Sequence, residues 1–348
     1  MKKLISIGLM MLILTLLLAM TPACGREEGE SKTIKFGLLT PLSGIAAQWG
    51  REIEEGAQWR VDTINEAGGI RVGSDRYLIK LVKGDSKFTG SEAVNEATRL
   101  IQHEGVHFML GPITTWSAID PIVLEGKCFV MCMTNSELVQ LGNPYMFMGA
   151  APVRVWYPTF WDQAYQFHPE IQTVAVISPD TNTYDSHFES DLSAHEKHGR
   201  EVVYTKRYTI SQTDYYPLLT PLVAKKPDAI SLAGVNKGDA DLMVKQVREL
   251  GYTGIIASAN HGDPQSTIDI AGCEYAEGFL NNDPDYSSNL YPKSVRELYN
   301  DFRQRFPGRP LALTTYLAHG AIDLFAAAIE EASSIDPDEV MKVFDNPH

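Results

Sequence analysis

Small polar residues follow three apolar, strand-like runs of the chain. They lie in TPLSGIAAQWG (40–50), GPITTWSAIDP (111–121) and MTNSEL (133–138). Taken singly, each Ser, Thr or Asn is typical of a helix N-cap. If the runs are parallel strands, however, their carboxyl ends bring these hydroxyls and the backbone N–H groups together, which suits a carboxylate or another small polar group. The pattern therefore predicts a binding site for a small polar ligand.

The motifs of common α/β enzymes do not occur in this sequence. No GxGxxG follows a strand-like run, and neither GxxxxGK[ST] nor GxSxG is present. His195 and His198 are three positions apart on a predicted helix, but a third metal ligand is not near, so we expect them on a solvated face. We predict no catalytic residue, no metal and no cofactor, and an α/β enzyme stays open as the alternative from a different class.

The rest of the chain alternates strand-like and helix-like segments. Apolar, β-rich runs predict strands, and apolar residues at a spacing of three and four predict the helices between them. Such alternation is typical of parallel sheets that carry helices on both faces. We therefore predict an α/β fold with strands at 33–39, 77–82, 107–110, 127–133, 173–177, 201–208, 228–232 and 254–258, and helices at 50–67, 91–104, 185–198, 314–333 and 336–344.

The first 24 residues have the pattern of a bacterial lipoprotein signal peptide. Two lysines precede an apolar run at 4–20, and small residues lead to Cys24. We predict export, acylation of Cys24 and a tether at 25–32, which would place the protein in the periplasm or at the cell surface, anchored by lipid. Thr21 departs from the usual lipoprotein pattern, so cleavage before Cys24 without acylation, and retention of the apolar run as a short anchor, stay open.

The chain is acidic and poor in cysteine. It has 30 Lys and Arg against 44 Asp and Glu, a net charge of −14. An acidic protein is not attracted to nucleic acid or to an anionic lipid surface, so neither is a predicted partner. Cys128 and Cys132 lie in an apolar, strand-like run, which favours buried thiols over a metal or redox pair.

Several segments, in order, resemble one known family. They are IKFGLLTPLSGIAAQWG, INEAGGI, FMLGPITTWSAIDP, MTNSEL, VAVISPDTNTYDSHF and KQVRELGYTGIIAS, within 33–344. They are similar to the extracytoplasmic solute-binding proteins of branched-chain amino acid ABC importers, the leucine/isoleucine/valine-binding type, and to their amide- and aromatic-acid-binding relatives. The resemblance implies a two-lobed type I periplasmic binding fold, with a parallel sheet flanked by helices in each lobe and hinge crossovers between the lobes.

The resemblance, and a length beyond that of one compact core, also imply the domain boundaries. We expect lobe 1 at 33–152 and 282–333, and lobe 2 at 153–281 and 334–348. Members of the family usually continue with a further strand pair, so we expect the sequence to be truncated at its C-terminus.

The resemblance further implies which residues contact the ligand. Thr115, with Trp116 beside it, matches the family's hydroxyl after the third strand, which holds the ligand carboxylate. Met133 and Thr134 match a backbone carbonyl and a threonine after the fourth strand. The full set of matching positions, with the first-loop serine and the aromatics of both lobes, is Ser43, Trp49, Thr115, Trp116, Met133, Thr134, Tyr184 and Asn260. For Trp116, packing at a helix start is the alternative.

Asn260 departs from the family's pattern. Amino acid binders of this family carry an acidic residue there, which pairs with the ligand ammonium, whereas Asn260 is neutral. A buried ammonium without a carboxylate is costly, although Asp263 could supply one if the alignment shifts. We therefore expect a ligand with a carboxylate or amide and an apolar or aromatic body but no obligatory amino group, and branched-chain amino acids are the main rival.

The resemblance also implies the partners. We expect a small-molecule ligand, ABC permease subunits that read the closed clamp, and a monomeric binding protein. Reading of the same clamp by a membrane signalling receptor stays open. Trp156 and Trp161 lie in an apolar helical run, and we expect them in the core rather than in the site.

Overall fold

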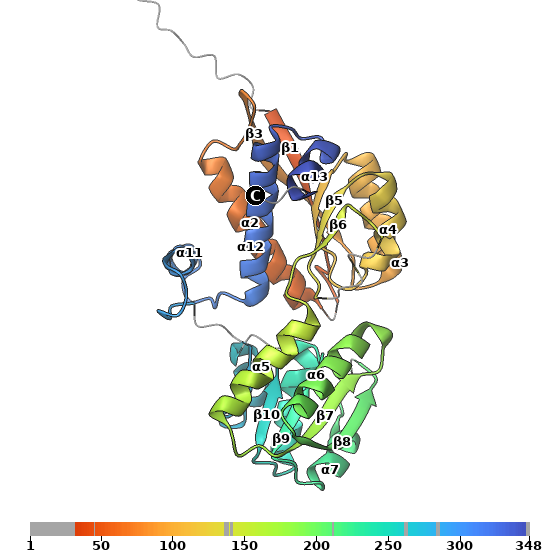
Figure 1. Cartoon of the computed structure of the whole chain (residues 1–348), viewed down its shortest axis with the longest axis vertical. Helices are drawn as coiled ribbons and strands as arrows, with labels where there is room; N and C mark the ends of the chain where they lie inside the picture. Colours follow the sequence, from red (N-terminus) through yellow and green to blue (C-terminus); the bar gives the residue numbers. More distant parts are fainter. Residues whose placement is uncertain are drawn as a thin grey trace, which may run out of the picture.

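Two lobes, one above the other in Figure 1, make up this protein, and each is built on one sheet. The computed structural model describes residues 32–345 except 45, 136–138, 140–141, 211, 261–263 and 283–285. The predictions for the signal peptide, Cys24 and the tether, and the suggested role of Asp263, lie outside the described residues. The predicted two-lobed α/β fold is confirmed.

The sheet of lobe 1 has the strand order β2, β3, β1, β4, β5, β6. All neighbouring pairs are parallel except β2 with β3. The central strand β1 is buried along most of its length, because helices cover both faces of the sheet. The strands are β1 (Lys32–Thr40), β2 (Ile70–Val72), β3 (Asp75–Asp85), β4 (Phe108–Leu110), β5 (Phe129–Cys132) and β6 (Met146–Met148).

The helices of lobe 1 divide between the two faces of this sheet. Phe36 and Phe108 turn to the face covered by α2 and α12, whose Phe325 meets both rings. Leu39 and Met109 turn to the other face, under α3 and α4. The helices are α2 (Ala47–Glu66), α3 (Gly90–Thr98), which continues as a π-helix (Arg99–His103), α4 (Trp116–Glu125), α12 (Leu313–Ala332) and α13 (Pro337–Asp345). Cys128 and Cys132 are buried in this core, where burial raises the pKa of both thiols.

The helix α13 packs on lobe 1, whereas we expected 334–348 to belong to lobe 2. The Phe344 ring lies 4.8 Å from that of Phe129, the β5 residue beneath it. Asp338 accepts a hydrogen bond of 2.6 Å from the Tyr145 hydroxyl and pairs with Lys127. The amphipathic pattern of this helix predicted that one face is buried, but both lobes offer an apolar surface of the required kind.

The sheet of lobe 2 has the order β11, β10, β9, β7, β8, with parallel pairing throughout. Its strands are β7 (Thr173–Pro179), β8 (Glu201–Tyr208), β9 (Ala229–Leu232), β10 (Ile255–Ser258) and β11 (Phe279–Asn281). The chain enters this lobe through α5 (Val153–Phe167), which lies beside α6 in Figure 1. The other helices of this lobe are α6 (Asp185–Lys197), α7 (Tyr216–Val223), α8 (Lys237–Glu249), α9 (Pro264–Ala271) and α10 (Cys273–Ala276). The next helix, α11 (Lys293–Arg305), packs on Trp59 of α2 in lobe 1.

A buried polar cluster in lobe 2 shows that the expected solvated face is wrong for His195. Its ring is completely buried, with Nε2 3.0 Å from Asp191 Oδ2. Trp161 and Ser231 donate to the other carboxylate oxygen at 2.7 and 2.9 Å. The buried carboxylate is thus satisfied by three partners, and the cluster fastens α5 and α6 to the sheet. His198 is partly buried and contacts Asp162.

Within the part of the chain that the structure describes, helices that could cross a membrane are absent. The same residues contain no cluster of three or more His, Cys, Asp or Glu side chains arranged to hold a metal ion.

Candidate ligand-binding cleft

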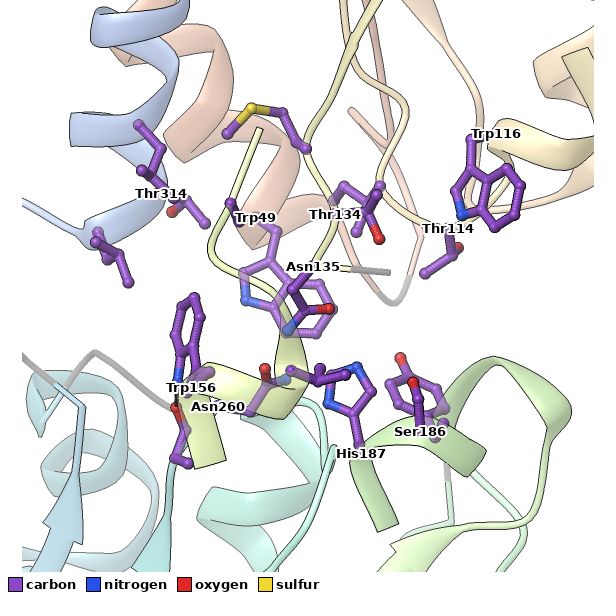
Figure 2. Close-up of a pocket in the computed structure, with 18 of the residues that line it drawn as sticks. Trp49, Thr114, Trp116, Thr134, Asn135, Trp156, Ser186, His187, Asn260 and Thr314 are labelled. Atoms are coloured by element: carbon purple, nitrogen blue, oxygen red, sulfur yellow. Dashed lines mark hydrogen bonds between the residues drawn. The ribbon is translucent and has the colours of Figure 1, made fainter. Parts of the chain in front are cut away.

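A cavity of about 740 Å³ lies between the two lobes. Figure 2 shows side chains that enter it from above and from below. Lobe 1 contributes Trp49, Ile53, Ile113, Thr114, Trp116, Ser117, Met133, Thr134, Asn135, Leu313, Thr314 and Leu317. Lobe 2, together with the connection from β6 to α5 that we call the hinge, contributes Ala150, Val153, Trp156, Asn182, Tyr184, Asp185, Ser186, His187, Lys237, Ala259, Asn260 and Asn282. A cavity of this size accommodates a small organic ligand.

Close packing of α2 against α12 builds one end of the cleft. Gly56 makes it possible, because a Cβ at this position would lie 2.1 Å from the backbone oxygen of Thr315. The contact brings the start of α12, with Thr314, beside the part of α2 that carries Trp49. The strand ends of lobe 1 form the other end, where Thr114 and Trp116 lie (Figure 2).

Six of the eight predicted ligand-binding residues line the cleft. They are Trp49, Trp116, Met133, Thr134, Tyr184 and Asn260. Ser43 is exposed outside the lining, where its hydroxyl donates to Asp85 Oδ2 at 2.6 Å. Thr115 is also outside the lining, and its hydroxyl oxygen is buried without a hydrogen-bond partner in the described part of the chain. The threonine of this turn that lines the cleft is its neighbour Thr114.

On the lobe 1 wall, the backbone amides of Met133 and Thr134 do not face the cleft as free donors. The Met133 N–H donates to the Pro112 carbonyl at 2.9 Å, and the Thr134 N–H to the Cys132 carbonyl at 2.8 Å. Both amides are therefore used within the protein. Asn135 projects downward into the gap in Figure 2, with donor and acceptor atoms on its amide.

On the lobe 2 wall, His187 presents a fixed donor. The Gly234 N–H donates to the Tyr157 oxygen at 2.7 Å, and this oxygen lies 3.2 Å from His187 Nδ1. Because the Tyr157 oxygen accepts from Gly234, its own proton is available for Nδ1, and the neutral imidazole then carries its proton on Nε2. Burial lowers the pKa of His187 to about 4, against a smaller opposing effect of the Asp191 charge. The ring is therefore neutral near pH 7 and acts as an N–H donor.

Tyr184 lies beside His187 in the same wall, with the two ring centroids 5.4 Å apart. Burial, with a smaller effect of the Asp239 charge, raises the pKa of Tyr184 to about 12. Its hydroxyl is therefore a neutral donor and acceptor, and its ring supplies apolar surface.

The charged residues in the lining are paired. Among the described lining residues the acidic one is Asp185, and its Oδ1 lies 2.8 Å from the Arg207 guanidinium. The basic one is Lys237, whose Nζ lies 2.6 Å from Oε1 of Glu52 on the other lobe. The Lys237 and Glu52 side chains are only 7% and 11% exposed. Within the described lining, then, the carboxylate that could receive a ligand ammonium is that of Asp185, whose charge Arg207 already offsets.

Trp156 lines the cleft, which corrects its predicted place in the core. Its indole N–H donates to the Ala259 carbonyl at 2.6 Å, and its ring stands at the lobe 2 side of the gap (Figure 2). Trp161, further along α5, is completely buried as predicted.

A model of the periplasmic binding protein family matches residues 33–346. This chain belongs to that family. It is 26% identical to the Leu/Ile/Val-binding protein homolog 8 of Brucella abortus (strain 2308), over 88% of this chain and 79% of that protein. The predicted resemblance to Leu/Ile/Val-type solute-binding proteins is thus confirmed, and the family implies an extracytoplasmic location.

Two solved structures show the same fold as this periplasmic binding protein. LivJ from Streptococcus pneumoniae, in complex with isoleucine, has a TM-score of 0.78 at 22% identity, over 89% of this chain and 87% of that one. A solute binding protein of an ABC transporter from Rhodopseudomonas palustris BisB5, in complex with 3,4-dihydroxybenzoic acid, has a TM-score of 0.71 at 20% identity, over 88% and 84%.

Sequence reasoning missed Lys237, Glu52 and His187. A signal for Lys237 was present, because it opens the helix that follows β9, the position where ligand-binding residues were sought on other strands. The sequence contains no such signal for Glu52, because its partner Lys237 is 185 positions away.

Proposed function

We propose that this periplasmic binding protein is the ligand-binding subunit of an ABC importer, which captures a small solute bearing a carboxylate or an amide. The observation that carries the proposal is a cleft lined from both lobes by hydroxyls, amides and aromatic rings. A ligand that touches both walls stabilises the closed arrangement over an open one, because only the closed arrangement lets it contact both lobes at once. The permease would then bind the closed form and receive the solute.

The chemistry of the cleft favours a ligand without an obligatory ammonium group. Asp185 is already paired with Arg207, and Asn260 offers an amide where a carboxylate would be required. A buried ammonium facing these groups would lose its hydration and would gain only a carboxylate whose charge Arg207 already offsets. Trp49, Trp116 and Tyr184 would enclose an apolar or aromatic body. Of the two bound ligands in similar structures, isoleucine has an amino group and 3,4-dihydroxybenzoic acid has none, and we propose a ligand of the second kind.

The location follows from the same proposal. Removal of a signal peptide that ends before Cys24, followed by acylation of Cys24, would tether a monomeric clamp to the outer surface of the membrane that holds the permease.

Thermal-shift measurements on the purified protein test the ligand class. The compounds are leucine, isoleucine and valine, their deaminated acids, benzoate, 3,4-dihydroxybenzoate and butanamide. A bound ligand at 100 times its Kd stabilises the folded protein by about 2.7 kcal/mol, which raises Tm by several degrees. We expect this rise with acids or amides and little change with the amino acids.

The variant N260D tests whether the missing carboxylate determines the ligand class. Because the substitution adds a carboxylate to the lobe 2 wall, the variant should gain stabilisation by leucine and lose it with the acids. Strong stabilisation of the wild-type protein by leucine, and none by the acids, would contradict the proposed ligand class.

A further inference from the structure

An ion pair between the two lobes forms part of the cleft wall. Lys237 is the first residue of α8, the helix that follows the carboxyl end of β9, and it lines the cleft. Its Nζ lies 2.6 Å from Oε1 of Glu52, which belongs to α2 of lobe 1. Both residues are at least nine-tenths buried.

Glu52 is held in place from its own lobe. Its second carboxylate oxygen accepts a hydrogen bond from the Thr314 hydroxyl at the start of α12. Thr314 stands at the opposite end of the cleft from Thr114 and Trp116 in Figure 2, so the pair lies at the end remote from the strand ends of lobe 1. Gln48 Nε2 also donates to Glu52 Oε1, at 3.4 Å, so the carboxylate has two partners on its own lobe and one on lobe 2, and it fixes the position of the Lys237 ammonium.

The lysine has hydrogen-bonding capacity left for a ligand. An ammonium carries three N–H donors, and the contact with Glu52 uses one of them. A ligand oxygen that reached this end of the cleft would receive a charge-assisted hydrogen bond in a site shielded from water.

We propose that Lys237 is a ligand-contacting residue that determines specificity, and that Glu52 positions it across the cleft. The ligand class is a small carboxylic acid that carries a second oxygen acceptor at its far end, such as a second carboxylate. One acceptor binds at the Thr114 end, and the other binds the Lys237 ammonium. This inference rests on the proposed function and narrows its ligand class.

Matched ligand pairs separate a ligand contact from a purely structural ion pair. The probes are hexanoate against adipate and benzoate against terephthalate, since each pair differs by one distal carboxylate. Calorimetric titration of the wild-type protein should give about 10-fold or more tighter binding of the dicarboxylate in at least one pair, as expected for one charge-assisted hydrogen bond. In K237M the ratio of the two Kd values should fall to near one.

Two further variants keep the test independent of folding. E52Q/K237M removes both charges, so that no buried charge is left unpaired, and it should show the same loss of discrimination as K237M. K83M removes an ion pair of the same 2.6 Å length, between Lys83 and Glu54, that lies within lobe 1. It should discriminate as the wild type does.

The outcomes are distinct. An equal preference for the dicarboxylate in wild type and in folded E52Q/K237M would overturn the role of Lys237 and leave the proposed importer function standing. A wild-type preference for the monoacids would overturn it as well. Failure of the wild type to bind any of the four acids, together with stabilisation by amino acids alone in the thermal-shift panel, would overturn the ligand class and the Lys237 assignment together.

Discussion

The His187 side chain lines the cleft, and it also makes the native protein less stable in acid. Its imidazole is buried, and its Nδ1 faces the Tyr157 hydroxyl, so protonation would place a second N–H against an oxygen that has a proton of its own. Burial lowers its pKa to about 4, compared with 6.5 for an ordinary histidine. The neutral ring is therefore part of the native structure.

We predict that His187 makes the protein less stable in mild acid. The unfolded chain binds a proton at this residue as the pH falls below about 6.5, whereas the native protein does not until about pH 4. The contribution of the neutral His187 ring to the free energy of unfolding is thus fully present above pH 6.5 and is lost as the pH falls toward 4. Between pH 7 and 5 the loss amounts to about 2 kcal/mol. Urea unfolding of wild type and H187Q at several pH values should show it as a smaller pH dependence in the variant.

His319 provides the comparison in the other lobe. It packs against Trp59, and burial, with a smaller effect of the Arg60 charge, lowers its pKa to about 4 as well. H319Q should therefore reduce the pH dependence by a similar amount, and the two effects should add because the sites are in separate lobes. For His187, the contradicting result is a free energy of unfolding that falls with pH equally in H187Q and in the wild type. It would show that the His187 ring accepts a proton in the native state.

At the scale of single residues, the sequence predicted those parts of the site that follow strands. Thr134 could be found because it comes directly after an apolar run, and parallel strands place such positions at one edge, whereas Asn260 followed from the resemblance to the family. Thr114 rather than Thr115 lines the cleft, and a loop pattern does not tell which of two adjacent threonines turns inward. The donor state of His187 could not be predicted, because it depends on Tyr157 and Gly234 from separate segments.

At the scale of elements, the cleft depends on how closely α12 approaches α2. The approach places Thr314 against Glu52, and it requires that residue 56 has no side chain. We predict that G56A lowers the free energy of unfolding by about 2 kcal/mol, because its Cβ would meet the Thr315 backbone oxygen, which cannot move without the helix. Urea denaturation measures this directly.

Gly320 is the matched control on α12. It is also a helical glycine, but it is exposed, and a Cβ there would meet no atom within 4 Å. G320A should therefore stabilise the protein by up to about 1 kcal/mol through the higher helix propensity of alanine. Equal effects of G56A and G320A would mean that the two helices can separate at no cost.

Most of the strands were predictable, and even the three-residue β4 was, whereas three other short strands were not. Runs such as those of β1 and β7 are apolar enough to be buried on both faces, so their strands were identified within two residues. The strands β2, β6 and β11 have three residues each and were not predicted, and the pairing with a neighbour defines them. The placement of α13 failed for a related reason, because amphipathicity identifies a buried face but not the partner that covers it.

At the scale of the whole molecule, each lobe has its own apolar cores, which do not extend across the cleft. The arrangement of the lobes therefore depends on the hinge and on the few contacts that cross between them. The Glu52–Lys237 pair is such a contact, and because it is buried, salt screens it weakly. In the absence of ligand it should bias the clamp toward closure.

We predict that loss of this pair opens the clamp. Spin labels can be placed on Cys273, which is exposed on lobe 2, and on N95C in the exposed part of α3 on lobe 1, in a C24S background. The distance between the labels should lengthen and broaden in E52Q/K237M without ligand, and should match the wild type in K83M, whose lost pair lies within one lobe. Identical distance distributions in all three proteins would mean that the hinge alone sets the arrangement. In that case the contribution of Lys237 would be confined to ligand contact, which the dicarboxylate titrations measure separately.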